Sequence, residues 1–221
     1  MNLIIGILGR PKMLDKKIAS FSSSLTDVII DKGNIPLGII APVKNENESM
    51  NIMDIKKLKK SIDLCDGIIL QGGSDYYQYD LEAIKHIYKK KIPILGICLG
   101  MQSMAVSFGS DLIAISNHNH SGIDYVHEVL LEEQSMLFKI IGQKKIMVNS
   151  RHNEMAISPK DLKIVGLCNN VIEAVEKEDH PFFIGVQWHP EDMAQYDERS
   201  RKLFTAFFSS CNAYKEKNKK L

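Results

Sequence analysis

Cys98 stands in the sequence pattern of an activated nucleophile. The apolar run Ile94–Ile97 predicts a buried strand, and the amphipathic segment after the cysteine predicts a helix. Gly96 and Gly100, two residues away on either side, permit the sharp and strained turn that joins such a strand to such a helix. Free N–H groups at the start of the helix would favour a thiolate on Cys98. The cysteines without this pattern are expected to be buried core residues: Cys65, Cys168 and Cys211.

His189 is the predicted general base for this thiol. It follows the apolar strand predicted at 182–186, and the carboxyl ends of parallel strands are where functional groups gather. Glu191 lies two residues further on, so both side chains can point the same way, and its carboxylate can hold the imidazole and stabilise an imidazolium. Taken alone, the pair is equally typical of a surface histidine followed by a helix start.

Gly72 and Gly73 follow another predicted strand and can bring a backbone N–H close to a bound carbonyl group. Together with the N–H of Leu99 at the start of the helix, the N–H of Gly73 would form a two-donor oxyanion hole. Two adjacent glycines by themselves indicate only a turn.

The elements that must position these residues alternate between strand and helix in the first half of the chain. This alternation predicts a parallel sheet with helices on both faces. After about residue 110 the predicted strands are short and closely spaced, which indicates an antiparallel or mixed extension of the sheet. The predicted strands are 2–8, 35–40, 66–70, 94–97, 126–131, 145–148, 163–167, 171–175 and 182–186, and the predicted helices include 15–32, 52–60, 80–90 and 197–212.

Composition predicts one ordinary globular domain over residues 1–212, followed by a flexible tail over 213–221. The formal net charge of +1 gives no reason to expect nucleic acid or an anionic membrane as a partner. Four scattered cysteines form neither a disulfide framework nor a zinc motif, so a reducing cytoplasm is the expected location. No cofactor is predicted, and a homodimer is only the general prior for such a chain.

Three motifs in order resemble the class I glutamine amidotransferase superfamily: Gln71-Gly72-Gly73, then Gly96 to Gln102, then Gln187 to Glu191. Within it, the segments Val148 to His152 and Ile172 to Glu176 are similar to those of the γ-glutamyl-γ-aminobutyrate hydrolase group, which is peptidase C26-like. The resemblance implies a flavodoxin-like, doubly wound, mostly parallel α/β sheet. It also implies cleavage of a γ-glutamyl amide through a γ-glutamyl thioester.

The resemblance assigns each site residue a role. Cys98 is the implied nucleophile, His189 the base and then the acid, and Glu191 the carboxylate that orients it. The N–H groups of Gly73 and Leu99 are the implied oxyanion donors. The implied substrate-binding residues are Gly72, Gln102, Ser150 and His152.

Two other features of the sequence bear on ligands. The loop Ser74 to Asp80 departs from the pattern of the group, which leaves the amine of the substrate open. His118, His120 and His127 include an H-x-H spacing that could chelate a metal ion. No acidic or cysteine partner lies in the same segment, so the sequence predicts no metal site.

Three functions remain open at this stage. The first is a free-standing cysteine-dependent hydrolase that acts on a small γ-glutamyl amine and releases glutamate. The alternative is a glutaminase subunit that passes ammonia to a separate synthase, with the same catalytic residues. The third is a non-catalytic binding protein, which the intact set of Cys98, His189 and Glu191 argues against.

Overall fold

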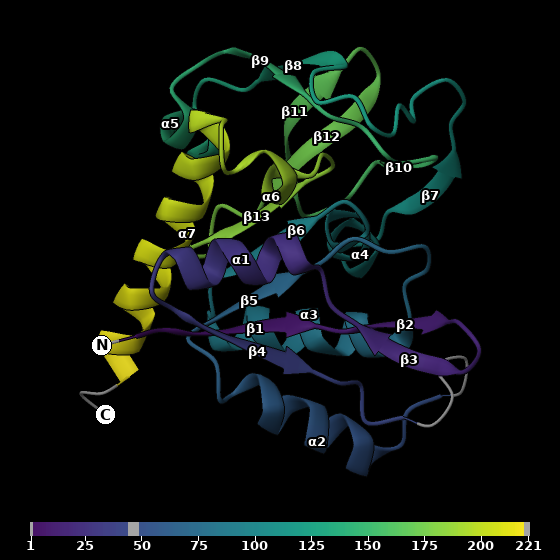
Figure 1. The fold of residues 1–221 in the computed structure, drawn as a ribbon, viewed down its shortest axis with the longest axis vertical. Helices are drawn as coiled ribbons and strands as arrows, with labels where there is room; N and C mark the ends of the chain where they lie inside the picture. The colour runs from purple at the N-terminus through teal and green to yellow at the C-terminus, as the bar shows by residue number, and fades with distance from the viewer. Residues whose placement is uncertain (1, 44–48, 219–221) are drawn as a thin grey trace.

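A nine-stranded sheet forms the centre of the molecule in the computed structural model, which describes residues 2–43 and 49–218 (Figure 1). Five neighbouring strands are parallel, and the other four continue the sheet in antiparallel pairing, as the sequence predicts. In spatial order the parallel strands are β4 (Ile35–Ile39), β1 (Ile4–Leu8), β5 (Gly67–Leu70), β6 (Ile94–Ile97) and β13 (Phe183–Val186). The antiparallel strands are β12 (Val171–Glu176), β11 (Lys163–Cys168), β8 (His127–Leu131) and β9 (Lys145–Val148).

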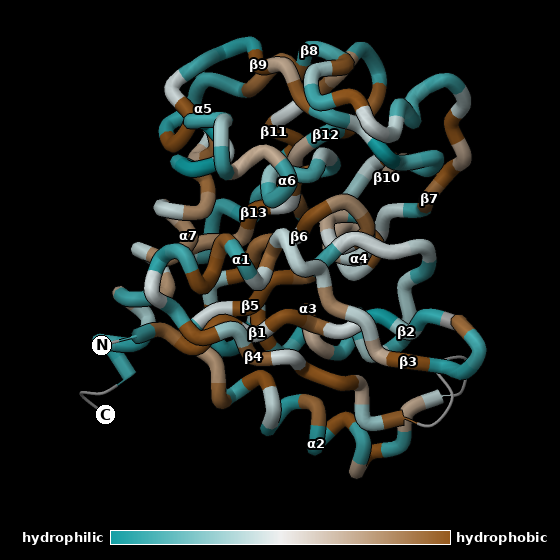
Figure 2. Tube along the Cα trace, viewed as in Figure 1, coloured by the Kyte–Doolittle hydropathy of each residue, from teal (hydrophilic) through white to brown (hydrophobic). Residues whose placement is uncertain are grey.

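Helices cover both faces of the sheet and bury a separate apolar cluster on each (Figure 1). The central strands supply the most hydrophobic part of the trace, which Figure 2 shows along β1 and β5. Because β5, β6 and β13 are buried at every position, they are apolar without alternation, as expected for a sheet covered on both sides. One face holds α1 (Ser23–Asp31), α5 (Met136–Ile141), α6 (Pro190–Met193) and α7 (Glu198–Asn218), and the other α2 (Ile52–Ile62), α3 (Gln78–Lys90) and α4 (Leu99–Ser107).

Two small hairpin-like sheets flank the central one. The strands β2 (Arg10–Met13) and β3 (Lys17–Ser20) pair with each other just after β1. The strands β7 (Asp111–Ala114) and β10 (Glu154–Ile157) pair across a long sequence interval. The sequence analysis predicts none of these four strands.

The helix predicted over residues 15–32 is wrong in its first half. The helix α1 begins only at Ser23, where the Ser22 hydroxyl accepts a hydrogen bond from the N–H of Leu25. Residues 17–20 alternate between exposed and half-buried positions, which is the period of a strand. Ile18 and Phe21 share a helical spacing with the apolar residues of α1, and this coincidence accounts for the wrong prediction.

The last helix continues beyond the end predicted at residue 212. It runs to Asn218, and Lys215 Nζ lies 2.7 Å from Asp66 Oδ2 and 2.9 Å from the carbonyl oxygen of Asn2. The predicted tail over 213–221 is therefore helical as far as residue 218, while residues 219–221 lie outside the described part. The assignment of residues 1–212 to a single domain stays a prediction.

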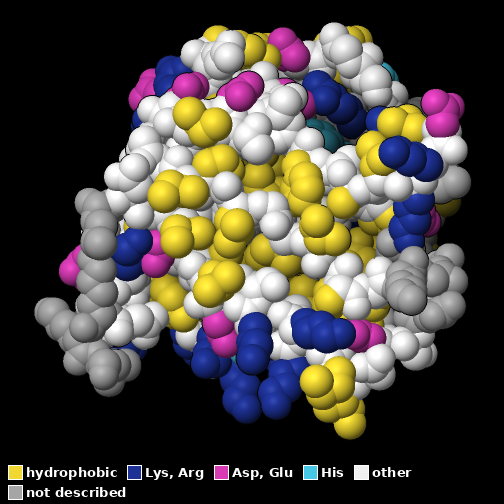
Figure 3. Space-filling view, turned by 60° about the horizontal axis from the view of Figure 1, so that its bottom comes forward, with side chains coloured by type: hydrophobic (Ala, Val, Ile, Leu, Met, Phe, Trp, Pro, Cys, Tyr) yellow, Lys and Arg dark blue, Asp and Glu magenta, His cyan; other side chains and the backbone are white. Residues whose placement is uncertain are grey.

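The surface carries both basic and apolar areas. Figure 3 shows Lys and Arg side chains along the lower edge of one face, below a broad area of hydrophobic side chains. The lysines of α2 are mostly exposed, in line with the solvated face expected for that segment. None of the helices within residues 2–43 and 49–218 has the length and apolar character to cross a bilayer.

Candidate active site

Cys98 lies at the junction of β6 and α4 with a backbone conformation that side chains rarely adopt. Its φ of 53° and ψ of −109° place it in a strained region, as the nucleophile-elbow pattern predicts. Its N–H donates to the carbonyl oxygen of Val186, the last residue of β13, at 2.9 Å. A Cβ on Gly100 would lie 2.1 Å from the Leu70 carbonyl oxygen, so the glycine is what lets α4 begin against the end of β5.

His189 and Glu191 form a hydrogen-bonded pair beside the cysteine. The segment after β13 crosses the carboxyl edge of the sheet, and His189 Nδ1 lies 2.9 Å from Glu191 Oε1. Because Nδ1 is engaged with this carboxylate, Nε2 is the nitrogen left for the thiol. A hydrogen bond joins the imidazole to Cys98. The structure thus brings together the three residues that the sequence predicts as the catalytic set.

The electrostatic surroundings favour a charged imidazole. Burial of His189 disfavours the imidazolium, but the hydrogen bonds and negative charges of Cys98 and Glu191 outweigh it and raise the pKa of His189 to about 10. By contrast, burial and the neighbouring Asp66 raise the pKa of the Cys65 thiol to about 12. The three cysteines predicted as core residues are all buried and free: Cys65, Cys168 and Cys211.

Asn149 holds the backbone of His189, and the sequence analysis gives it no role. Its Oδ1 accepts from the His189 N–H at 2.7 Å, and its Nδ2 donates to the His189 carbonyl oxygen at 3.0 Å. The side chain is fully buried, so these two bonds satisfy an amide that would otherwise be unpaired. The available signal is a polar residue directly after the apolar strand Lys145–Val148, but its partner lies 40 residues away.

Gly72 and Gly73 line the same site from the end of β5. A Cβ on Gly72 would lie 3.0 Å from His189 Cε1 and 3.6 Å from the Cβ of Cys98, so this glycine faces both residues. A Cβ on Gly73 would lie 2.9 Å from Leu99 Cδ2, so the two residues predicted as oxyanion donors are neighbours. As the first residue of α4, Leu99 has no helical carbonyl to receive its N–H.

The polar atoms of the other predicted substrate-binding residues bond to groups of the chain. Gln102 Nε2 donates to the Glu154 carbonyl oxygen at 2.8 Å. The Ser150 hydroxyl donates to the carbonyl oxygen of His118. His152 Nδ1 contacts the Glu154 carbonyl oxygen at 2.9 Å. A direct role for Gln102, Ser150 and His152 in substrate binding therefore stays a prediction.

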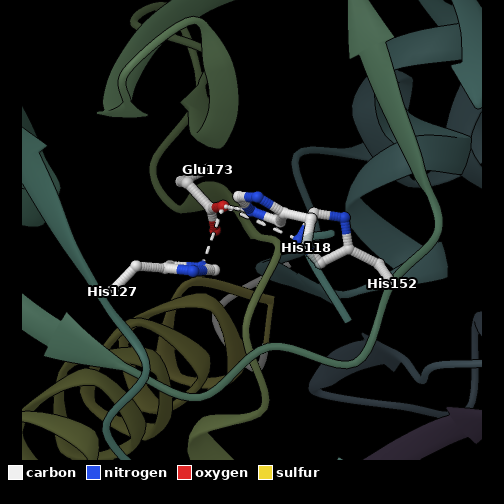
Figure 4. A group of neighbouring side chains, drawn as sticks. All are labelled: His118, His127, His152 and Glu173. Carbon is white, nitrogen blue, oxygen red and sulfur yellow. Dashed lines mark hydrogen bonds and ion pairs between the residues drawn. The ribbon is translucent and has the colours of Figure 1, made fainter. Parts of the chain in front are cut away.

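A second cluster lies beyond Gln102, where three histidines surround Glu173 (Figure 4). His118, His127 and His152 all point their Nε2 atoms at this carboxylate. Burial alone would raise the pKa of Glu173, but its contacts with the three imidazoles lower it. Glu173 is the acidic partner that the histidine segment itself lacks, whereas His120 is exposed and lies outside the cluster.

The fold, the elbow at Cys98 and the pair of His189 and Glu191 together define a cysteine-dependent amidotransferase site. The family described as glutamine amidotransferase class-I matches residues 28–209. The chain belongs to this family. Its narrower assignment to the γ-glutamyl-γ-aminobutyrate hydrolase group stays a prediction.

Curated relatives are synthases or synthase components. The CTP synthase of Thermotoga maritima is 31% identical over 195 residues, which span 70% of this chain and 37% of that protein. The glutamine-hydrolyzing component of a GMP synthase from Methanosarcina barkeri is 32% identical over 151 residues, which span 67% of this chain and 75% of that component. The chain thus spans well under half the length of the CTP synthase from T. maritima and most of the GMP synthase component.

Solved structures share the fold over nearly the whole chain. A putative GMP synthase component from Thermoplasma acidophilum has a TM-score of 0.73 at 20% identity, covering 99% of this chain and 98% of that one. The glutaminase domain of a Trypanosoma brucei CTP synthase, solved with bound acivicin, has a TM-score of 0.70 at 17% identity, covering 96% and 94%. These similarities confirm the predicted flavodoxin-like α/β fold.

Proposed function

We propose that this chain is a glutaminase that hydrolyses the side-chain amide of glutamine and supplies the ammonia to a synthase. The observation that carries the proposal is the strained Cys98 beside an imidazole that Glu191 holds at 2.9 Å. A cysteine at such an elbow with an oriented histidine can attack an amide carbon. Among the functions left open by the sequence, the relatives favour this one over hydrolysis of a γ-glutamyl amine.

In the proposed reaction the sulfur of Cys98 attacks the side-chain amide carbon of glutamine, and the carbonyl oxygen becomes an oxyanion. The N–H groups of Gly73 and Leu99 stabilise this oxyanion. His189 gives a proton from Nε2 to the leaving nitrogen, which departs as ammonia and leaves a γ-glutamyl thioester on Cys98. His189 then takes a proton from water, the water attacks the thioester, and glutamate and the thiol are released.

The proposed substrate site lies at the carboxyl edge of the parallel strands. Gly72 faces His189 and Cys98 closely, so a glycine here leaves room for the amide of the substrate. Asn149 acts on the substrate only through His189, whose backbone it holds. We propose that a reducing cytoplasm is the setting, because the reaction needs a free thiol.

A synthase partner is part of the proposal, because the matched relatives are synthases or their components. Exposed apolar side chains occur in loops that follow strands at the same edge as Gly73. Ile40, directly after β4, is 65% exposed, and Tyr76, after β5, is 39% exposed. An apolar rim beside a site that releases ammonia suits a partner that receives it.

Glutamate release by the purified chain tests the proposal directly. We expect hydrolysis of glutamine, with activity lowered about 10³-fold or more in Cys98→Ser, because the covalent intermediate cannot form efficiently. The matched control is Cys168→Ser, which removes a buried thiol outside the proposed site and should retain activity. A panel of γ-glutamyl amines run in parallel distinguishes the alternative substrate class.

Each outcome of this panel decides something. Preference for glutamine, with stimulation by a co-purified synthase, supports the glutaminase function. Preference for a γ-glutamyl amine with glutamine unused overturns it in favour of the hydrolase alternative. Full activity in Cys98→Ser would overturn both.

A further inference from the structure

The cluster around Glu173 contains four potential ligand atoms from four separate segments (Figure 4). Glu173 lies on β12, His127 begins β8, and His118 and His152 lie in loops. The Nε2 atoms of His118, His127 and His152 lie 2.9, 3.5 and 3.6 Å from Glu173 Oε1. All four ligand atoms lie within 4.8 Å of one another.

The hydrogen bonding of His152 leaves a lone pair that points at a carboxylate. Its Nδ1 contacts the Glu154 carbonyl oxygen, and since a carbonyl only accepts, Nδ1 must carry the proton. In the neutral ring Nε2 then has a lone pair directed toward Glu173, 3.6 Å away. The side chains of His152 and Glu173 are only 2% and 1% exposed, so water does not relieve this contact.

Three atoms in the cluster lack a hydrogen-bond partner despite complete burial. They are His127 Nε2, His152 Nε2 and Glu173 Oε2, as judged among the described residues. Buried polar atoms are normally paired, so an unpaired group of donors facing one centre requires an explanation. A cation bound between the imidazoles and the carboxylate would satisfy them, because each Nε2 and the carboxylate would bind it with a lone pair.

The spacing fits a transition-metal ion. Zinc binds histidine nitrogen and carboxylate oxygen at about 2.0–2.2 Å, so the ligand atoms of a tetrahedral site lie about 3.4 Å apart. The contacts of the three nitrogens with Oε1 are within a few tenths of this spacing. The bond from His152 Nδ1 to a carbonyl is also the usual outer contact of a histidine that binds a metal ion.

We propose that His118, His127, His152 and Glu173 bind a divalent transition-metal ion, zinc by preference. Four protein ligands fill a tetrahedral shell, so the ion would be structural and would not activate water. It would join β8 and β12 to the loops that carry His118 and His152. The proposal does not depend on the proposed glutaminase function.

The site connects to the proposed active site through the chain. The Glu154 carbonyl oxygen accepts from both His152 Nδ1 and Gln102 Nε2. The Glu173 carbonyl oxygen accepts from the N–H of Gln187 at 2.8 Å, two residues before His189. A bound ion would therefore help to position the segment that carries His189.

Metal titration of the full chain tests the proposal without any measurement of activity. The protein carries Cys98→Ser, which removes the thiol of the other site, and is stripped with a chelator before calorimetric titration with Zn²⁺. We expect one ion per chain, and binding weakened about 100-fold or more in Glu173→Gln or His118→Asn, since even outer contacts contribute roughly 10- to 100-fold. The matched control is His120→Asn, an exposed histidine two positions from His118, which should bind as tightly as the parent.

X-ray absorption of the zinc-loaded parent protein provides a measurement that needs no cluster variant to fold. We expect a shell of nitrogen and oxygen ligands at about 2.0–2.1 Å, with no sulfur. A sulfur ligand would overturn the assignment, as would tight binding that survives Glu173→Gln and His118→Asn. Absence of stoichiometric binding would show that protons alone satisfy the cluster, and would also overturn the proposal.

Discussion

At the scale of single residues, Glu191 sets the protonation of the histidine beside Cys98. Its contact with His189 Nδ1 contributes to the raised pKa of that imidazole, which is about 10. Glu191→Gln removes the negative charge and should lower this pKa. The alkaline limb of kcat/KM for glutamine, where the imidazolium that protonates ammonia is lost, should then move to lower pH. We also expect kcat to fall about 10²-fold.

The control for this prediction is Asp192→Asn, which removes a neighbouring carboxylate that pairs with Arg151. Its pH profile should keep the alkaline limb of the parent protein. Profiles of both variants measured on one glutamine assay separate the two effects. An unchanged alkaline limb in Glu191→Gln would contradict the role assigned to the carboxylate.

Residue-level prediction succeeded where the interacting groups are close in sequence. Cys98 has its glycines within two positions, and His189 has Glu191 two positions away, so a short motif contains the information. Asn149 and Glu173 were given no role because their partners lie 40 and 55 residues away, and only the fold brings them together. Their burial as polar groups is the common physical feature, and burial depends on packing.

At the scale of elements, Gly100 determines how closely α4 approaches β5. In an exposed helix, Gly→Ala stabilises by about 1 kcal/mol. Here a Cβ would meet the Leu70 carbonyl oxygen at 2.1 Å, so we expect Gly100→Ala to destabilise the protein by about 1–3 kcal/mol. Urea unfolding measures the change, with Ser107→Ala at the end of the same helix as the control for helix propensity. A more stable Gly100→Ala would refute the close approach.

A buried ion pair supports the loop that carries Gly73. Arg10 Nη1 lies 2.7 Å from Asp80 Oδ1, with side chains 6% and 0% exposed. Arg10→Met leaves the carboxylate buried without its partner, so we expect a loss of about 3–5 kcal/mol in urea unfolding. Adding Asp80→Asn removes that unpaired charge and should restore part of the stability. If the double variant is no more stable than Arg10→Met, the buried charge is not the cause.

The elements themselves were predictable in proportion to their length and burial. The apolar strands β5, β6 and β13 and the helix α3 follow from uninterrupted apolar or amphipathic runs. The short strands β7 and β10 are only partly buried and pair with each other across about 40 residues, so no local period marks them. Residues 17–20 show the opposite error, because neighbouring apolar residues imitate a helical period.

At the scale of the whole molecule, two buried histidines limit the pH range of stability from opposite sides. Burial and the nearby charge of Lys91 lower the pKa of His180 to about 4, whereas the pKa of His189 is raised to about 10. An unfolded histidine titrates near 6.5. The contribution of His189 is therefore complete below about pH 6.5 and is lost as the pH rises toward 10. The contribution of His180 is present above 6.5 and is lost as the pH falls toward 4.

The acid side of this range gives the sharper test, because His180 titrates without a coupled thiol. Its shift corresponds to at most about 3 kcal/mol lost between pH 6.5 and 4. Urea unfolding of His180→Gln, with a chelator present throughout, should show a free energy of unfolding that falls less steeply over that interval than in the parent protein. His120→Gln, at an exposed position, should follow the parent closely. Parallel curves for His180→Gln and the parent would show that other groups govern acid unfolding.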